Sequence, residues 1–133
     1  MTDNFISRLS INEFNKSHSG ILILDIVELS ENYAHLLSIP RRPDFYQLIF
    51  LYEGKADVHV ETTLHDISSY SVISIAKNQV TNVLFEEKSF GFVLLFDQDF
   101  IYEHPDDMGL LNNLKNFDST IDTIVLNSTQ VLP

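Results

Sequence analysis

The chain has 133 residues, enough for one domain, and 44% of them are hydrophobic, so it can bury a core of its own. Eight Lys and Arg oppose 19 Asp and Glu, giving a formal net charge of −11, so we expect no direct contact with DNA, RNA or an anionic membrane surface. The absence of cysteine excludes disulfides, thiol catalysis and cysteine zinc sites, and it fits a cytoplasmic location.

The first third of the chain is predicted to contain one helical turn and one strand. Residues 11–17 could form a short helical turn, and the apolar, β-branched run 21–29 (ILILDIVEL) predicts a strand. Pro40 and Pro43 flank two arginines, which argues against regular structure there. We expect neither a signal peptide nor a membrane span, because the first 19 residues are polar and no apolar run is long enough.

The middle of the chain predicts a series of antiparallel strands. The run 45–52 (FYQLIFLY) predicts a buried strand, and after a turn the alternating run 56–63 (ADVHVETT) predicts its hairpin partner. Residues 64–69 are polar and are expected to connect strands. Further strands are predicted at 70–75, 80–85 and 91–96, the last in a central position. Strands at a spacing of about 10 residues favour a β-sandwich or barrel.

The last third predicts helices at 97–103 and 108–117 and a closing strand at 122–126. The apolar end at Val131 and Leu132 suggests a longer parent chain. We expect no catalytic residues, because the chain has no phosphate loop, no nucleophile elbow, no H-E-x-x-H helix and no closely spaced pair of histidines.

Three blocks of sequence, in order, resemble the N-terminal cupin-type domains of AraC-family transcription regulators. The first block has a basic residue, then Asp-Phe-Tyr, a strand, a glycine and a second strand. The second stands where that family has a stretch ending in Pro-Gly-Gln-Val-His. The third has glycine, an apolar strand and Asp-Phe-Ile. The blocks are 41–61 (RRPDFYQLIFLYEGKADVHVE), 70–81 (YSVISIAKNQVT) and 90–101 (FGFVLLFDQDFI).

The resemblance implies a mainly β fold, a cupin-like double-stranded β-helix (jelly roll) with one or two short helices toward the C-terminus. Residues 1–133 would be a single sensor domain that binds an unidentified small-molecule effector, forms a possible homodimer, or does both. In such regulators DNA is bound by a separate C-terminal helix-turn-helix domain, and no basic helix pair occurs here. The chain would then be an excised sensor domain or a truncated member of the family.

The sequence departs from metal-binding cupins at the positions where those proteins place histidine and glutamate ligands. Arg41 and Asp44 stand before the first strand, Thr81 stands where the last histidine would be, and Lys77-Asn78 replace the family's Pro-Gly. Arginine and lysine are not metal ligands at ordinary pH, and threonine alone is too weak. We therefore expect no bound metal, no cofactor and no oxygenase chemistry.

Five side chains are candidates for contact with an effector, and each has a structural alternative. Arg42 could bind a carboxylate or a sugar, or it could form a surface ion pair with Asp44, which we favour. Tyr46 shares a strand face with Leu48 and Phe50, and could point its hydroxyl into a pocket or stand at its rim. The other three are expected near the mouth of the jelly roll, unless they only form turns: Gln79, Thr81 and Asn82.

Two other functions remain open at this point. The first is a stand-alone, metal-free small cupin that acts on a sugar or small acid, for which Tyr46 and His59 are the available acid–base groups. The second is a dimerisation module whose interior is filled by its many phenylalanines.

Overall fold

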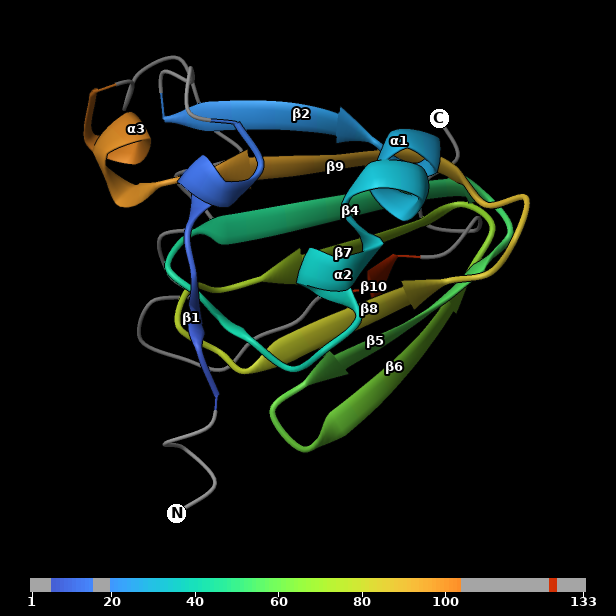
Figure 1. Cartoon of the computed structure of the whole chain (residues 1–133). Helices are drawn as coiled ribbons and strands as arrows, with labels where there is room; N and C mark the ends of the chain where they lie inside the picture. Colours follow the sequence, from blue (N-terminus) through green and yellow to red (C-terminus); the bar gives the residue numbers. More distant parts are fainter. Residues whose placement is uncertain (1–5, 16–19, 104–124, 127–133) are drawn as a thin grey trace.

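A computed structural model describes residues 6–15, 20–103 and 125–126 (Figure 1). Mainly β structure is confirmed: within these ranges, ten strands in several sheets and a few short helices make a β-sandwich of the jelly-roll kind. The elements are β1 (Arg8–Leu9), η2 (Ile11–Glu13), β2 (Ile21–Asp25), α1 (Ile26–Asn32), α2 (Ala34–Leu37), β3 (Arg42–Pro43), β4 (Tyr46–Glu53), β5 (Lys55–Val60), β6 (Thr63–Ser68), β7 (Ser71–Ile75), β8 (Thr81–Phe85), β9 (Phe90–Phe96), α3 (Gln98–Glu103) and β10 (Val125–Leu126).

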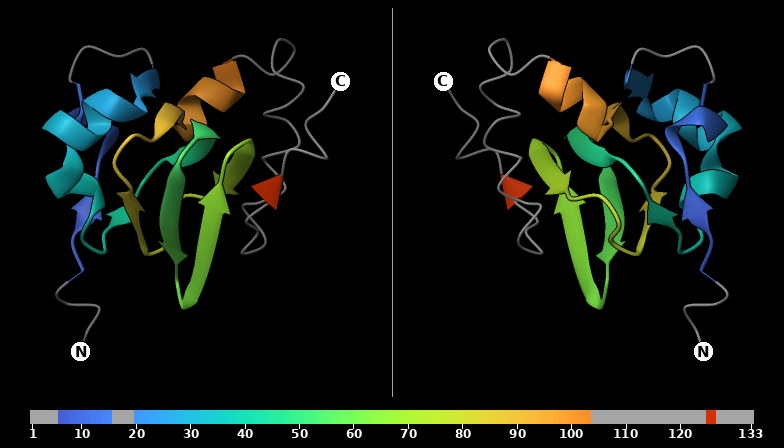
Figure 2. Two further views of the ribbon diagram at one scale, coloured as in Figure 1. Left: turned by 90° about the vertical axis from the view of Figure 1, so that its right-hand side faces the viewer. Right: turned by 90° about the vertical axis from the view of Figure 1, so that its left-hand side faces the viewer.

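Two antiparallel sheets form the body of the domain (Figures 1 and 2). The larger has the strand order β10-β7-β4-β9-β2, and the smaller has the order β6-β5-β8. The predicted central position of β9 is confirmed, since it pairs with both β4 and β2. The short strands β1 and β3 form a separate parallel pair. Helix α1 packs on β9 and α2 on β8, so the two helices span from one sheet to the other.

The two faces of β4 carry different clusters of apolar side chains, as the strand parity predicts. Ile49 and Leu51 point between the sheets, where they meet Val58 and Val60 of β5 in the main core. The other face carries a second cluster on the outside of the larger sheet, which α3 partly covers through Phe100. Its buried members are Tyr46, Leu48, Ala76, Phe96 and Phe100.

The predicted strand at 21–29 is wrong in its second half. The strand ends at Asp25, whose carboxylate accepts hydrogen bonds from the N–H groups of Val27 and Glu28 and so caps helix α1. Ile26 and Leu29, three residues apart, are the buried positions of that helix. A continuous apolar run cannot by itself distinguish a strand from a buried helix, and here the capping aspartate decides where one becomes the other.

Two segments expected to be irregular take part in strand pairing. Residues 64–69 were expected to be a connection, but Thr63–Ser68 forms the edge strand β6. Arg42 lies in β3, and Arg41 exchanges backbone hydrogen bonds with Thr81. Arg42 precedes a proline, and residues before proline favour extended backbone, which is the conformation that β3 needs to pair with β1.

The remaining predictions agree with the described residues as far as these extend. The helix expected at 97–103 is α3, and its first turn is capped by the Asp97 carboxylate, which accepts the N–H of Phe100 at 2.8 Å. The closing strand is present as β10, paired with β7. The helix predicted at 108–117 lies outside the described residues. No helix in the described ranges is long and apolar enough to cross a membrane.

The β8–β9 turn is fastened to the β4–β5 turn. The Ser89 hydroxyl donates to the carbonyl of Lys55 at 3.0 Å and accepts its N–H at 3.3 Å, and the Glu86 N–H donates to the same carbonyl at 2.9 Å. Close approach requires glycine at position 54, where a Cβ would stand 2.6 Å from Ser89 Cα. These contacts hold residues 86–89 in one position relative to the sheet.

Candidate functional site

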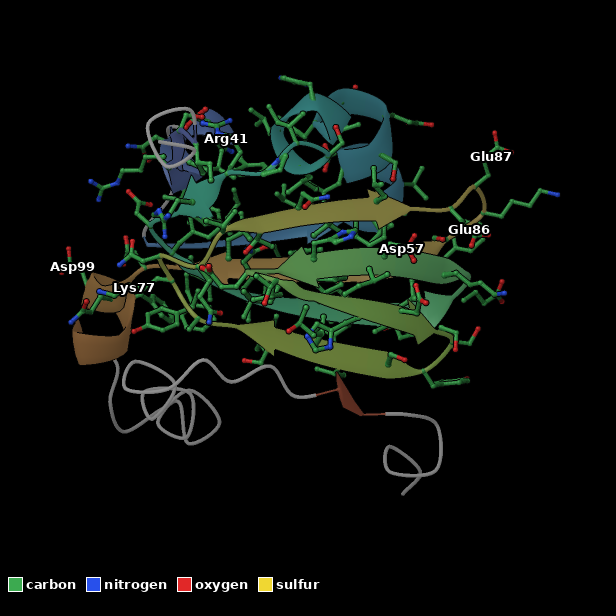
Figure 3. All side chains as sticks on the ribbon, turned by 90° about the horizontal axis from the view of Figure 1, so that it is seen from below. Arg41, Asp57, Lys77, Glu86, Glu87 and Asp99 are labelled. Atoms are coloured by element: carbon green, nitrogen blue, oxygen red, sulfur yellow. The ribbon has the colours of Figure 1, made fainter. Side chains whose placement is uncertain are left out.

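Four of the chain's eight basic residues gather at one end of the sandwich, which we call the polar end. It is formed by β1, β3 and the β7–β8 turn, and its basic residues are Arg8, Arg41, Arg42 and Lys77. Figure 3 shows Arg41 and Lys77 at this end, and Asp57, Glu86 and Glu87 at the opposite end. Two of these cations are paired with carboxylates, Arg8 with Asp44 and Arg41 with Glu13, so the polar end combines both signs of charge.

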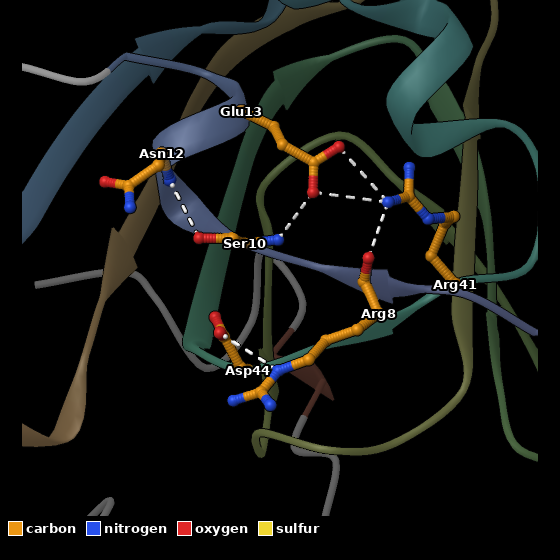
Figure 4. A network of polar contacts seen from close by, with 6 residues as sticks. All are labelled: Arg8, Ser10, Asn12, Glu13, Arg41 and Asp44. Carbon is orange, nitrogen blue, oxygen red and sulfur yellow. Dashed lines mark hydrogen bonds and ion pairs between the residues drawn. The ribbon is translucent and has the colours of Figure 1, made fainter.

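Arg41 is the anchor of the polar end (Figure 4). Its Nη2 donates to the carbonyl of Arg8 at 2.6 Å and to both carboxylate oxygens of Glu13 at 3.2 Å. Glu13 also accepts the N–H of Ser10, completing a capping box around η2. Burial acts to raise the pKa of Glu13, but the Ser10 N–H and the Arg41 guanidinium outweigh it and hold that pKa below its usual value.

Two buried polar groups of the polar end lack partners among the described residues. Gln79 is 6% exposed, yet neither atom of its carboxamide has a hydrogen-bond partner within the described part of the chain, and the same is true of Arg41 Nε. Gln79 has the parity of Thr81 and Val83, which are also buried. An unpaired buried polar group costs about 1–3 kcal/mol, which a bound polar molecule would recover.

A small hollow lies beside Thr81, the backbone partner of Arg41, but neither Gln79 nor Arg41 lines it. It lies where α2 meets β8 and has a volume of about 10 Å³, which holds about one water molecule. Leu36 and Leu37 of α2 form its apolar wall, while Gln47 and Thr81 provide its polar side. A larger ligand could enter only if α2 moved, and α2 is a four-residue helix without a side-chain cap.

The structure brings together most of the residues proposed for an effector site. Thr81 and Asn82 line the hollow, and Arg42 Nη1 donates to the carbonyl of Asn78, next to Gln79, at 2.9 Å. The expected ion pair of Arg42 with Asp44 is not the one observed, because the Asp44 carboxylate pairs with Arg8 Nε at 3.2 Å. The roles of these residues in binding stay predictions.

Tyr46 lies apart from the hollow. Its ring is 2% exposed and stacks on Phe96, with centroids 5.3 Å apart, on the outer face of the larger sheet. Lys77 Nζ lies 6.0 Å from the centre of the ring and hydrogen-bonds the side chain of Gln98. Tyr46 is therefore a packed aromatic residue beside the polar end, and its neighbour Gln47 is the one that faces inward.

Arg41 and Gln47 are the residues of the polar end that the sequence reasoning missed. The position of Gln47 could have been found, because strand parity places it on the same face as Ile49 and Leu51. Arg41 could not, because its partners Arg8 and Glu13 lie 33 and 28 residues away in the chain.

The opposite end carries a pair of like charges. Asp57 of β5 stands directly across from Asp66 of β6. A hydrogen bond with Asp66 raises the pKa of Asp57, with smaller contributions from burial and from the charges of Asp66 and Glu86. Because the folded-state pKa is raised, this pair destabilises the fold increasingly as the pH rises above the usual value for aspartate.

We therefore expect the Asp66→Asn variant to unfold at a higher urea concentration than the wild type at pH 7, with a gain that shrinks toward pH 4. Urea unfolding curves at several pH values measure this. Asp99→Asn, which removes an exposed carboxylate from the first turn of α3, is the matched control and should bring no gain in stability. An equal gain from both variants would show that total charge matters and not the pair.

Within the described ranges, no group of three or more His, Asp or Glu side chains is placed to hold a metal ion. The predicted absence of a metal stays a prediction.

No protein-family model and no curated protein match the chain. Among solved structures it is similar to ToxT from Vibrio cholerae, at 14% identity and a TM-score of 0.42 over 80% of this chain and 41% of that one. ToxT of strain SCE256 with a bound unsaturated fatty acid has 17% identity and a TM-score of 0.43, over 83% of this chain and 42% of that one. ToxT of strain O395 bound to a methylnaphthalenyl butenoic acid has 13% identity and a TM-score of 0.43, over 80% of this chain and 41% of that one. The chain thus spans about two fifths of these proteins, and likenesses of this strength establish neither a family nor a ligand.

Proposed function

We propose that this chain is the regulatory, effector-sensing domain of an AraC-type transcription regulator and is not an enzyme. The observation that carries the proposal is the buried carboxamide of Gln79, which has no hydrogen-bond partner among the described residues. Support also comes from the three resembling sequence blocks. They include β4, β7 and β9, which are neighbours in the larger sheet, and β5 of the smaller sheet.

The effector we propose is a small carboxylic acid, because the polar end combines cationic and neutral donors. Its carboxylate would accept from the Gln79 amide and from Arg41, and its apolar part would lie against Leu36 and Leu37. Since the hollow holds only about one water molecule and neither Gln79 nor Arg41 lines it, the ligand would favour an arrangement with α2 displaced. A ligand that binds one arrangement more tightly shifts the population toward it, and a DNA-binding domain joined to this one would respond.

A thermal-shift screen of small aliphatic and aromatic carboxylic acids and sugars tests this proposal. A ligand present at 100 times its Kd stabilises the native state by about 2.7 kcal/mol, which raises the melting temperature by several degrees. We expect an acid to produce this shift and the matching neutral amide not to. If no compound of either class shifts the transition, effector sensing at this site is contradicted.

The Gln79→Met variant is expected to be more stable than the wild type without ligand, by about 1 kcal/mol, because it removes unpaired polar atoms at similar volume. It should also lose the shift caused by the acid. Urea unfolding measures the first effect and the thermal-shift assay the second. Ser89→Ala, which deletes a hydroxyl with two observed bonds, is the control and should be destabilising. A destabilised Gln79→Met variant would show that the carboxamide is already paired.

A second candidate function, a dimerisation module with a filled interior, is favoured by the small volume of the hollow, about 10 Å³. Sedimentation equilibrium distinguishes an effector-sensing domain from a dimerisation module. A dimer that forms without ligand, in a protein whose melting temperature no ligand changes, supports the module. For a metal-free enzyme the described residues offer little, because Tyr46 and His59 lie on different sheets.

A further inference from the structure

A second concave surface lies at the end of the molecule away from the polar end. It is an open groove of about 610 Å³ between α1 and the β8–β9 turn. Its apolar surface comes from Val27, Phe85 and Phe90, and Phe90 is 44% exposed. Aromatic and aliphatic surface in an open groove is typical of a place where another molecule binds.

A smaller cavity adjoins the groove, between the helices and β8. This cavity has a volume of about 120 Å³ and shares Ser30 and Phe85 with the groove. Leu29, Leu37 and Val83 form its walls. A cavity of this kind beside a groove can take one apolar side chain of a bound polypeptide, as is usual for the anchor residues of an interface.

The rim of the groove is acidic. Glu31 of α1 stands on one side, and Glu86 and Glu87 of the turn stand on the other, with Lys88 as the single cation of the lining. The Asp57 and Asp66 pair lies on the adjoining strands, close enough for Glu86 to act on the charge of Asp57. Figure 3 shows Glu86, Glu87 and Asp57 together, at the end away from Arg41 and Lys77. A cationic partner would relieve this accumulation of negative charge.

Both walls of the groove are held in place before anything binds. The Asp25 cap fixes the first turn of α1, and the bonds between Ser89 and Lys55 fix the β8–β9 turn. A surface that is already ordered loses little conformational entropy on binding.

We propose that this groove binds a basic polypeptide segment that carries one apolar anchor residue. The lysine or arginine side chains of the segment pair with Glu31, Glu86 and Glu87, and the anchor enters the cavity beneath Phe85. The site is separate from the polar end, and the proposal holds whether or not an effector binds there.

Fluorescence anisotropy with a short labelled peptide of Leu, Lys and Ala tests this on the whole chain. We expect the peptide to bind, and to bind more weakly as the salt concentration rises. A peptide with Glu in place of Lys should not bind, and a peptide with Ala in place of Leu should bind more weakly.

Among variants of the protein, Glu87→Gln should weaken peptide binding about threefold, while the matched Asp99→Asn should have almost no effect. Phe90→Ala should weaken it about tenfold or more, and its control Tyr70→Ala, an exposed aromatic outside the lining, should not.

Three results would overturn the proposal. The first is the absence of binding at a peptide concentration of about 1 mM, where even the weakest specific contacts are seen. The second is equal weakening by Glu87→Gln and Asp99→Asn, which would mean attraction by net charge alone. The third is self-association of the protein that Phe90→Ala abolishes and the peptide does not compete with, since the groove would then belong to a second copy. Circular dichroism of each variant confirms that it is folded.

Discussion

Replacing Gly91 by alanine is expected to lower the free energy of unfolding by about 3 kcal/mol or more, although it adds only one methyl group. Gly91 lies in β9 with a φ of 153°, at the point where the pairing with β4 shifts register beyond Leu51. A Cβ on this residue would overlap the carbonyl oxygen of Phe50 and approach Ile26 Cδ1 to 3.0 Å. Since β4 and β9 are the middle of the larger sheet, neither strand can move away cheaply.

Gly20→Ala is the graded control for this prediction. Gly20 also has a positive φ, of 88°, but its Cβ would meet the carboxylate of Asp97 at 2.9 Å, and a side chain can move where a backbone carbonyl cannot. We expect a loss of about 1–2 kcal/mol there. Urea unfolding compares the two variants, and a Gly91→Ala protein as stable as Gly20→Ala would show that the bulge next to β9 is free to shift.

Replacing Phe45 by alanine is expected to cost about 3–5 kcal/mol, as is usual when a large aromatic side chain is deleted from a core. Phe45 is fully buried, at 0% exposure, and meets the ring of Phe14 edge to face with centroids 6.1 Å apart. Phe14 follows η2 and contacts Tyr33 as well, so Phe45 ties the N-terminal segment to both α1 and the sheet. Its removal should loosen the polar end along with the core.

Phe45→Leu keeps most of the volume and should cost less than about 1.5 kcal/mol. The Phe14→Leu variant and the double variant complete a cycle, which should give a coupling energy of about 0.5–1.5 kcal/mol for the ring contact. Purely additive losses would contradict the role of Phe45 in holding the N-terminal segment.

Strand alternation was sufficient to predict most of the fold. The apolar runs 45–52 and 91–96 correspond to β4 and β9, and each of these strands lies between two others in the larger sheet. The segment 64–69 was missed because β6 is an edge strand whose side chains mostly face solvent, Leu64 included at 49% exposure. A strand that buries few side chains is held by backbone pairing with β5, which leaves little trace in the order of residue types.

The candidate site was only partly predictable, for a different reason. Gln79 and Thr81 were named because the family resemblance places them near the mouth of the jelly roll, and both are buried. The assignment of Asp44 to Arg42 failed because proximity in sequence was used in place of proximity in space, and the parallel pairing of β1 with β3 brings Arg8 closer. The groove beside Phe90 depends on a helix that the sequence suggested was strand.

The junction at Asp25 has a consequence for how the two ends of the domain could influence each other. Because Asp25 is both the last residue of β2 and the cap of α1, no flexible linker separates strand from helix. Strand β2 begins at Ile21, paired with Phe96 in the cluster that contains Tyr46, and runs the length of the sheet to α1. A displacement of α1 by a bound segment would therefore act directly on the end of β2 and on its pairing with β9.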